Sequence, residues 1–206
     1  MDFFEKVKGF LLEPSKTFDA IKGENLSEAI KYYAVIAAIY SVLFAVLLAF
    51  VLTFVGTLFG SMMGGRNLGM LMGAGAGAGG AIIFFILFMI AVIIGAFIGG
   101  AILHIFVYIV GGRKGIAQTI KAVMYGSTPG LLLGWIPVVN IITAIWSIVL
   151  NILGIRQLHE LTTGKAVLAV LIPIIIVVIL AVIVVAFLTI GSVSSEGMGG
   201  PYSRGY

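Results

Sequence analysis

The sequence predicts an all-α polytopic membrane protein, with an N-terminal amphipathic helix followed by a bundle of five transmembrane helices. Of its 206 residues, 61% are hydrophobic and only 10% are charged, whereas soluble domains carry about 25% charged residues. The mean hydropathy is +1.23. Five stretches approach or exceed the ~20 apolar residues that cross a bilayer. Lipid must therefore be the solvent for much of the chain.

The five predicted spans are divided by short polar or glycine-rich segments, and they cover residues 34–59, 81–110, 118–135, 138–155 and 166–190. The third and fourth come from one apolar region that Gly134, Trp135 and Pro137 interrupt. Each is about 18 residues long, which is near the lower limit for a helix that crosses a bilayer. Residues 1–33 are predicted to be a cytoplasmic amphipathic segment. Residues 191–206 are small and polar and are predicted to be a disordered external tail.

Basic residues set the predicted orientation in the membrane. Ten of the twelve fall on one side of the five-span arrangement: Lys6, Lys8, Lys16, Lys22, Lys31, Arg113, Lys114, Lys121, Arg156 and Lys165. Only Arg66 and Arg204 fall on the other side. Because positive residues concentrate in cytoplasmic segments, the N-terminus is predicted inside the cell and the C-terminus outside, with the protein in the cell membrane. A six-span alternative divides the same residues six against six, which removes the bias and favours five spans.

Residues 64–80 separate the first two spans and contain the run GAGAGAGG. Glycine strongly disfavours a helix in water. The segment is therefore predicted to be a flexible external loop, and a re-entrant segment that dips into the membrane is the alternative.

The N-terminal segment has apolar residues at helical spacing, namely Phe3, Phe4, Val7, Phe10 and Leu11. This spacing predicts an amphipathic helix that lies in the membrane interface. A cytoplasmic segment folded against the bundle explains the same pattern equally well. Pro14 is expected to end this helix, Phe18 and Ile21 to belong to a short second helix, and Ser27 to cap the next one.

Polar side chains in the fourth predicted span form one row, with Asn140, Thr143, Ser147, Asn151 and Gly154 at steps of three or four residues. Such steps place all five on one face of a helix, which is expected to point into the bundle. The row either lines a polar pathway or packs against a neighbouring helix through hydrogen bonds and small side chains. We favour helix packing because no charged residue joins the row.

Rows of small residues in the second and third spans predict close helix contacts of the small-xxx-small type. The rows are Ala91, Gly95 and Gly99 in the second span and Gly126, Gly130 and Gly134 in the third. Pro129 cannot donate a hydrogen bond to the carbonyl of Tyr125, so that carbonyl needs another partner and the helix is expected to kink. His104 is a candidate proton relay, although a lone histidine in a span more often bonds a neighbouring helix.

Sequence motifs for catalysis are absent from the chain. GxxxxGK[ST], HExxH and GxSxG do not occur, and there are no cysteines. His104 and His159 are too few and too far apart in the sequence to predict a metal site. We therefore expect no enzymatic activity, no catalytic residues, no metal, no cofactor and no nucleic-acid partner.

Three segments carry a resemblance to a known family: FLLEPSKTFDAIK with EAIKYYAVIAAIY, then GGRKGIAQTIKAVMYGSTPGLLLGWIP, and then IWSIVLNILGIRQLHELTTGKAVLAVLIPII. In their order and spacing they resemble the Yip-domain proteins, specifically the compact prokaryotic type. The resemblance implies five spans with a cytoplasmic N-terminus. It also implies fold-defining roles for Pro14, Tyr125, Pro129, Arg156 and His159. Eukaryotic members bind Rab-type GTPases, a role that does not transfer safely to this compact form.

Two functions remain open at the level of sequence. The leading hypothesis is a non-enzymatic membrane protein that organises the bilayer or partner proteins, with the lipid bilayer, a second copy or another membrane protein as its partners. The alternative is a small transporter or channel that uses the row from Asn140 to Asn151 and the kink at Pro129.

Overall fold

A computed structural model describes residues 1–62 and 78–197, and all regular structure within these ranges is helical. The helices are α1 (Phe3–Leu12), α2 (Pro14–Ala20), α3 (Leu26–Met62), α5 (Ala78–Ile109), α6 (Ile116–Gly126), α7 (Thr128–Leu133), α8 (Pro137–Leu158) and α9 (Thr163–Gly197). The all-α prediction is therefore confirmed for the described residues. Most of the predicted loop at residues 64–80 lies outside these ranges.

Four helices are long and apolar enough to cross a bilayer, namely Leu26–Leu58 in α3, Ile82–Ile109 in α5, Pro137–Leu158 in α8 and Thr163–Ile190 in α9. The third predicted span, residues 118–135, differs from the prediction because it forms two short helices instead of one. α6 has 11 residues and α7 has 6, and each alone is shorter than the ~20 residues that a span needs. The helical path breaks at Ser127, just before Pro129.

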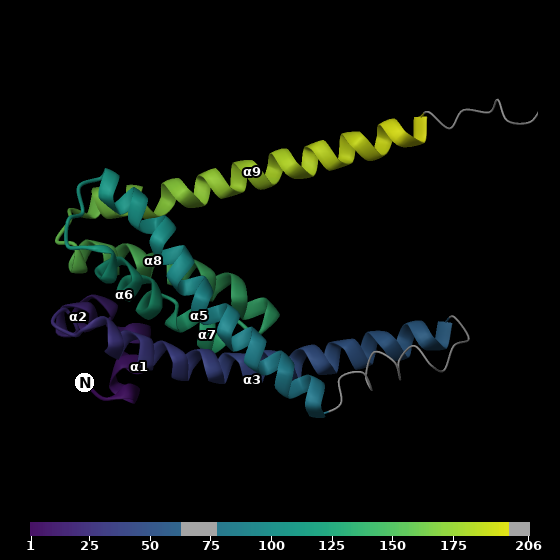
Figure 1. Cartoon of the computed structure of the whole chain (residues 1–206), viewed down its shortest axis with the longest axis horizontal. Helices are drawn as coiled ribbons and strands as arrows, with labels where there is room; N and C mark the ends of the chain where they lie inside the picture. Colours follow the sequence, from purple (N-terminus) through teal and green to yellow (C-terminus); the bar gives the residue numbers. More distant parts are fainter. Residues whose placement is uncertain (63–77, 198–206) are drawn as a thin grey trace, which may run out of the picture.

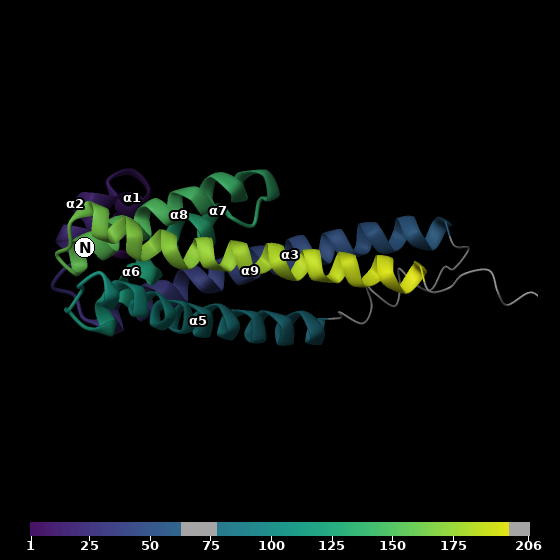
Figure 2. The ribbon, with the colours of Figure 1, turned by 90° about the horizontal axis from the view of Figure 1, so that it is seen from above.

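The bundle is closely packed at one end and open at the other (Figure 1). α3, α5 and α9 begin or end at the same end of the molecule as the N-terminus, and α9 diverges from α3 toward the opposite end. Seen from above, α6 lies at the same end as α1 and α2 (Figure 2). We call this closely packed end the head. It consists of α1, α2, α6 and the adjoining ends of α3, α5, α8 and α9.

Two helices form in the N-terminal segment, although Ile21, predicted to belong to the second, lies just past the end of α2. Asp2 and Glu5 make a reciprocal capping box at the start of α1, which satisfies two otherwise free backbone N–H groups. Pro14 begins α2 directly after α1 ends, where its missing N–H costs nothing. The predicted cap of α3 is wrong, because Asn25 rather than Ser27 accepts the backbone N–H of Glu28.

The small-residue row of α5 differs from the prediction in its partners. Added Cβ atoms at Gly95 and Gly99 would meet no atom within 4 Å, so this row makes no close helix contact within the chain. The neighbouring Gly100 does, since a Cβ there would lie 2.9 Å from the side chain of Ile120 in α6. The residue of α5 that packs closely on α6 is thus Gly100 and not the predicted Gly99.

The C-terminal helix is longer than predicted. Residues 191–197 continue α9 to Gly197 and are not part of a separate tail. Residues 198–206, the remainder of the predicted tail, lie outside the described ranges.

Candidate functional site: the polar centre of the head

Glu24, in the connection between α2 and α3, is the centre of a charged cluster. Its carboxylate lies 2.7 Å from the amine of Lys6 and accepts a hydrogen bond of 2.6 Å from the hydroxyl of Tyr125. Burial alone would raise the pKa of Glu24, but the hydrogen bonds from Lys6 and Tyr125 outweigh it and hold the pKa below its usual value. Glu24 therefore stays ionised and joins α1 to α6.

Lys121 is a buried cation in the same cluster. Its amine donates to the backbone carbonyls of Glu24, at 2.5 Å, and of Lys22, at 3.3 Å. An unpaired buried cation would be costly, so these contacts hold the connection between α2 and α3 against α6.

Four aromatic rings surround the charged cluster on its apolar side. Phe10 stacks on Tyr125 with ring centres 4.9 Å apart, and it meets Phe18 at the same distance. Tyr32 of α3 lies 5.1 Å from Tyr125. All four are buried. Rings in such arrangements contribute beyond their buried area, so this group fixes α1 and α2 onto α3 and α6.

The break between α6 and α7 is satisfied by a side chain. Pro129 has no N–H to donate to the carbonyl of Tyr125. This carbonyl instead accepts a hydrogen bond of 2.7 Å from the hydroxyl of Thr128. Because that hydroxyl has a single proton, the 3.0 Å contact between Tyr32 and Thr128 must use the proton of Tyr32. The predicted need for another partner at this carbonyl is confirmed.

His104 and His159, which lie 55 positions apart in the chain, meet through Thr119. The Thr119 hydroxyl lies 2.8 Å from Nδ1 of His104 and 2.9 Å from Nε2 of His159. Thr119 and His159 are buried. The chain of hydrogen bonds connects α5, α6 and the end of α8, and Thr119 was not singled out from the sequence.

The hydrogen-bond chain has a direction, because Thr119 can donate to only one of its two histidines. The other histidine must then donate to the Thr119 oxygen. The second ring nitrogen of His159, Nδ1, is buried and has no hydrogen-bond partner in the described part of the protein. Burial, followed by the nearby His104 and Lys114, lowers the pKa of His159 to about 4. His159 is thus held neutral, and an added proton would lack a partner.

The polar row of α8 packs against the glycine row of α6 and α7. A Cβ at Gly126 would lie 2.8 Å from Oδ1 of Asn151, one at Gly130 would lie 3.2 Å from Oγ of Ser147, and one at Gly134 would lie 3.1 Å from Nδ2 of Asn140. Gly154, the last member of the row, meets Phe18 and Ala122 instead. The two rows that the sequence predicts separately therefore form one helix contact.

Hydrogen-bond donors of the α8 row are used locally. Asn140 donates to the carbonyl of Gly134 at 2.7 Å, Thr143 to the carbonyl of Asn140 at 3.0 Å, and Asn151 to the carbonyl of Ser147 at 2.8 Å. Thr143 is buried, whereas Asn140 is exposed. Oγ of Ser147 and Oδ1 of Asn151 are buried and have no hydrogen-bond partner among the residues that the structure describes. The row is therefore a helix contact more than a continuous polar lining.

Asn151 also borders a groove of about 380 Å³ between α5, α8 and α9. Ten of the eleven residues that line it are glycine, proline or aliphatic, among them Gly99, Leu103, Val170 and Pro173. An apolar lining of this kind suits hydrocarbon better than a hydrated solute.

Arg156 and its neighbour Gln157 hold the end of α8 against α2. Arg156 donates to the Ser15 hydroxyl at 3.2 Å. Gln157 donates to the Ser15 carbonyl and hydroxyl, each at 2.8 Å, and to Asp19 at 3.2 Å. The structure places Arg156 in the contact between helices of the head.

Glu24, Thr119 and Gln157 were not singled out from the sequence, and the contacts that Lys6, Phe10 and Thr128 make in the head were not predicted. The contact between Lys6 and Glu24 cannot be predicted from one sequence, because the rest of α1, all of α2 and two changes of chain direction lie between the two residues. Within residues 1–62 and 78–197, no three His, Cys, Asp or Glu side chains group closely enough to hold a metal.

Comparison with protein-family models gives a match to the Yip1 domain over residues 8–186. The match covers most of the chain, from the second half of α1 to residue 186 in α9. The resemblance seen in the three sequence segments is thereby confirmed. Comparisons with curated proteins and with solved structures give no match.

Proposed function

Because the chain belongs to the Yip1 domain family and carries four helices able to span a membrane, we propose that it is a non-enzymatic, multi-pass membrane protein that organises the bilayer or partner proteins. One observation carries this proposal. The polar row of α8 packs against the glycines at positions 126, 130 and 134. Cβ atoms added there would lie 2.8, 3.2 and 3.1 Å from Asn151, Ser147 and Asn140, so this helix contact leaves little room for a hydrated solute.

We further propose that α6 and α7 together make the third of five crossings. Their 17 helical residues run from the head toward the far end of the bundle, and α8 returns to the head (Figure 1). This direction alternates with those of α5 and α8, as a crossing requires. It also keeps Arg113, Lys114 and Arg156 on the side of the N-terminus, in agreement with the positive-inside rule.

Apolar surface on the outside of the bundle supports a partner that is lipid or another membrane protein. Side chains from Ile175 to Ile190 of α9 are exposed over most of the helix, and those of α3 from Val46 to Leu58 are largely so. Gly95 and Gly99 add a row on α5 that is free for close approach. Such rows favour contacts between membrane helices, including contacts with a second copy of the chain.

The second candidate function is a small transporter or channel, and the groove beside Asn151 is the observation that favours it. A broken helix next to a groove can form a substrate site, and α6 and α7 break at Ser127. The groove is mainly apolar, so the candidate substrate is itself apolar.

Reconstitution into liposomes separates the two functions. Purified protein would be tested for flux of a panel of ions and small solutes, and for change in vesicle size or shape by electron cryomicroscopy. We expect remodelling without flux. Flux that disappears in Asn151→Leu but survives in Asn140→Leu, a matched change on the same helix outside the groove, would overturn the proposal in favour of transport.

The proposed topology has a separate test, since the chain contains no cysteine. Single cysteines at Lys16, Lys114 and Ser203 would be labelled in intact cells with a membrane-impermeant thiol reagent. We expect only position 203 to react from outside. Labelling at position 114 in intact cells would contradict the five-span orientation.

A further inference from the structure

We propose that α1 is a bilayer-inserting element, held rigidly by the head so that its outer face enters the cytoplasmic leaflet beside α3. We define this outer face as Met1, Phe4, Lys8 and Leu12. This inference rests on the proposed function, which supplies the membrane and the orientation of the chain. The partner of the outer face is the boundary between lipid headgroups and acyl chains.

Exposed apolar side chains gather on this outer face. Phe4 is 79% exposed, Leu12 is 68% exposed and Met1 is 53% exposed. The steps of three, four and four residues from Met1 to Leu12 keep them on one side of the helix. Lys8 lies between them, and a lysine can bury its alkyl stem while its amine reaches the headgroups.

The opposite face of α1 is fixed to the head. Lys6 is buried in its ion pair with Glu24, and the fully buried Phe10 stacks on Tyr125. A helix anchored at two successive turns cannot rotate to hide its outer face. The exposure of Phe4 and Leu12 is therefore a fixed property of the folded head.

α1 lies across α3 and not along it. Phe3 and Phe10, two turns apart on α1, both approach the single ring of Tyr32, with ring centres 5.4 and 6.1 Å away. Figure 1 shows α1 running at a steep angle to α3, beside the first part of that helix. Since α3 is one of the membrane-spanning helices, a crossing helix lies roughly in the plane of the bilayer.

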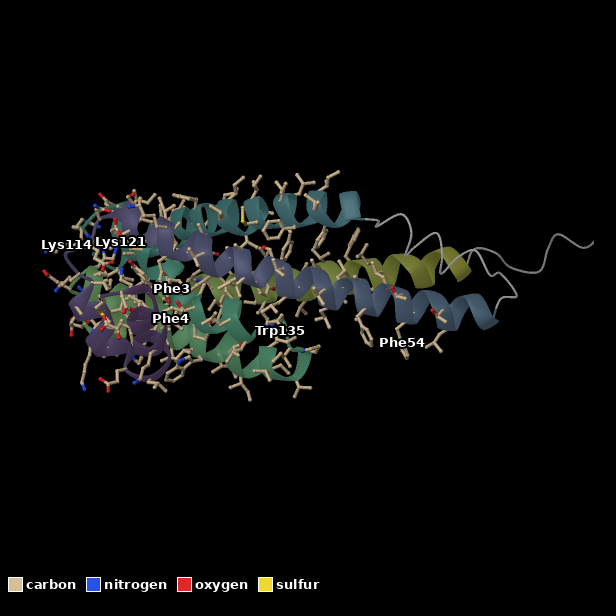
Figure 3. The ribbon with its side chains drawn as sticks, turned by 90° about the horizontal axis from the view of Figure 1, so that it is seen from below. Phe3, Phe4, Phe54, Lys114, Lys121 and Trp135 are labelled. Atoms are coloured by element: carbon tan, nitrogen blue, oxygen red, sulfur yellow. The ribbon has the colours of Figure 1, made fainter. Side chains whose placement is uncertain are left out.

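The level of α1 along the bundle matches the edge of the membrane. Phe3 and Phe4 lie between the end that carries Lys114 and Lys121 and the more central Trp135 (Figure 3). A notch of about 210 Å³ lined by Met1, Phe3, Lys31 and Val35, among others, joins α1 to the first turns of α3. Val35 is itself 48% exposed. Met1 of the outer face and Val35 of α3 therefore border the same notch, which Lys6, Glu28 and Lys31 also line.

Charge on α1 indicates that apolar contact drives its insertion. Asp2 and Glu5 balance Lys6 and Lys8 in the helix and its cap. Electrostatic attraction to anionic lipid is therefore nearly cancelled. The proposal commits to zwitterionic bilayers as sufficient partners.

Site-directed spin labelling tests the insertion. Single cysteines would be placed at Phe4 and Leu12 on the outer face, at Lys16 on the exposed surface of α2, and at Val42 on the lipid-facing side of α3. In phosphatidylcholine liposomes, the ratio of oxygen to nickel-chelate accessibility at positions 4 and 12 should be several-fold higher than at position 16. It should approach the ratio at position 42.

Added anionic lipid should leave these ratios almost unchanged. Nickel-chelate accessibility at positions 4 and 12 equal to that at position 16, with or without anionic lipid, would overturn the insertion and indicate a docking surface for a protein. Protection that appears only with anionic lipid would overturn the apolar mechanism.

A double variant connects insertion to function. Phe4→Ser with Leu12→Ser should abolish most vesicle remodelling without lowering the melting temperature, because both side chains are exposed. Lys16→Ser with Lys165→Ser, at two exposed lysines outside α1, is the matched control and should keep remodelling. Unchanged remodelling in Phe4→Ser with Leu12→Ser would overturn insertion as the remodelling element. If the labels at positions 4 and 12 are protected but the wild-type protein neither remodels vesicles nor captures a partner, insertion of α1 is supported and the proposed organising function is rejected.

Discussion

The hydroxyl of Tyr125 in α6 donates to the carboxylate of Glu24 across 2.6 Å, although 101 positions separate the two residues. Lys6 of α1 contacts the same carboxylate. One ionised side chain thereby joins α1, the connection that leads into α3, and α6. The head depends on this shared contact, because α1 and α6 are short helices and α3 begins only two residues after Glu24.

Removing the Tyr125 hydroxyl should destabilise the head. Tyr125→Phe keeps the ring stack with Phe10 but leaves the carboxylate of Glu24 short of one donor, which is expected to cost about 1–3 kcal/mol. The free energy of unfolding in detergent, measured by denaturant titration, checks this. Tyr108→Phe, at an exposed tyrosine of α5, should change it by less than about 0.5 kcal/mol. Equal effects of the two changes would contradict the role of the Glu24 contact.

Thr128 should be replaceable by serine but not by valine. Thr128→Val removes the donor to the Tyr125 carbonyl and the acceptor for Tyr32, so we expect a loss of about 1–3 kcal/mol in the free energy of unfolding. Thr128→Ser keeps both hydrogen bonds and should lose less than half as much. A similar loss in both variants would show that the methyl group, and not the hydroxyl, is the part that matters.

Gly126→Ala and Gly99→Ala should act differently although they make the same chemical change in two helices. A Cβ at Gly126 would lie 2.8 Å from Oδ1 of Asn151, whereas one at Gly99 meets nothing within 4 Å. Overpacking typically costs about 1–3 kcal/mol, so Gly126→Ala should lower the melting temperature measured in detergent. Gly99→Ala should leave it unchanged or raise it, since alanine favours helix. The reverse order would place the close helix contact on α5.

Stability should fall as the pH is lowered from about 6.5 toward about 4. The pKa of His159 is lowered from 6.5 to about 4 in the folded protein, so the unfolded chain binds more protons within this window, and folding is favoured as the pH rises. The effect is measured by melting temperatures between pH 7 and pH 5. This range lies above the pKa of Glu24, so the titration of that carboxyl does not contribute. His159→Gln should flatten this part of the profile. A wild-type profile that is already flat would contradict the buried neutral histidine.

Helical content and the long apolar helices could be read from the sequence because they depend on local composition. The spans predicted at residues 34–59 and 166–190 lie within α3 and α9. The helix contact between α8 and the α6–α7 segment was only half predicted. Each row has a clear period, but periodicity does not say which helix a row will face.

The third predicted span, residues 118–135, is the element that local sequence patterns did not predict correctly. Pro129 predicts a disturbance at Tyr125, and the structure agrees. Hydropathy, however, counts residues 118–135 as one apolar stretch, whereas the polar cluster around Glu24 holds Lys121 and Tyr125 in the head. The length of a helix is set here by contacts from elsewhere in the chain.

The sequence by itself determined that this chain is a helical membrane protein of the Yip1 domain family, because hydropathy, basic-residue distribution and family motifs are properties of neighbouring residues. Only the tertiary structure brought Lys6 to Glu24, Glu24 to Tyr125, and His104 through Thr119 to His159. These pairs have no fixed spacing, and their burial is tolerable only when partners from distant segments arrive together. The physical reason is that buried polar groups need hydrogen bonds, and the fold alone decides which ones they obtain.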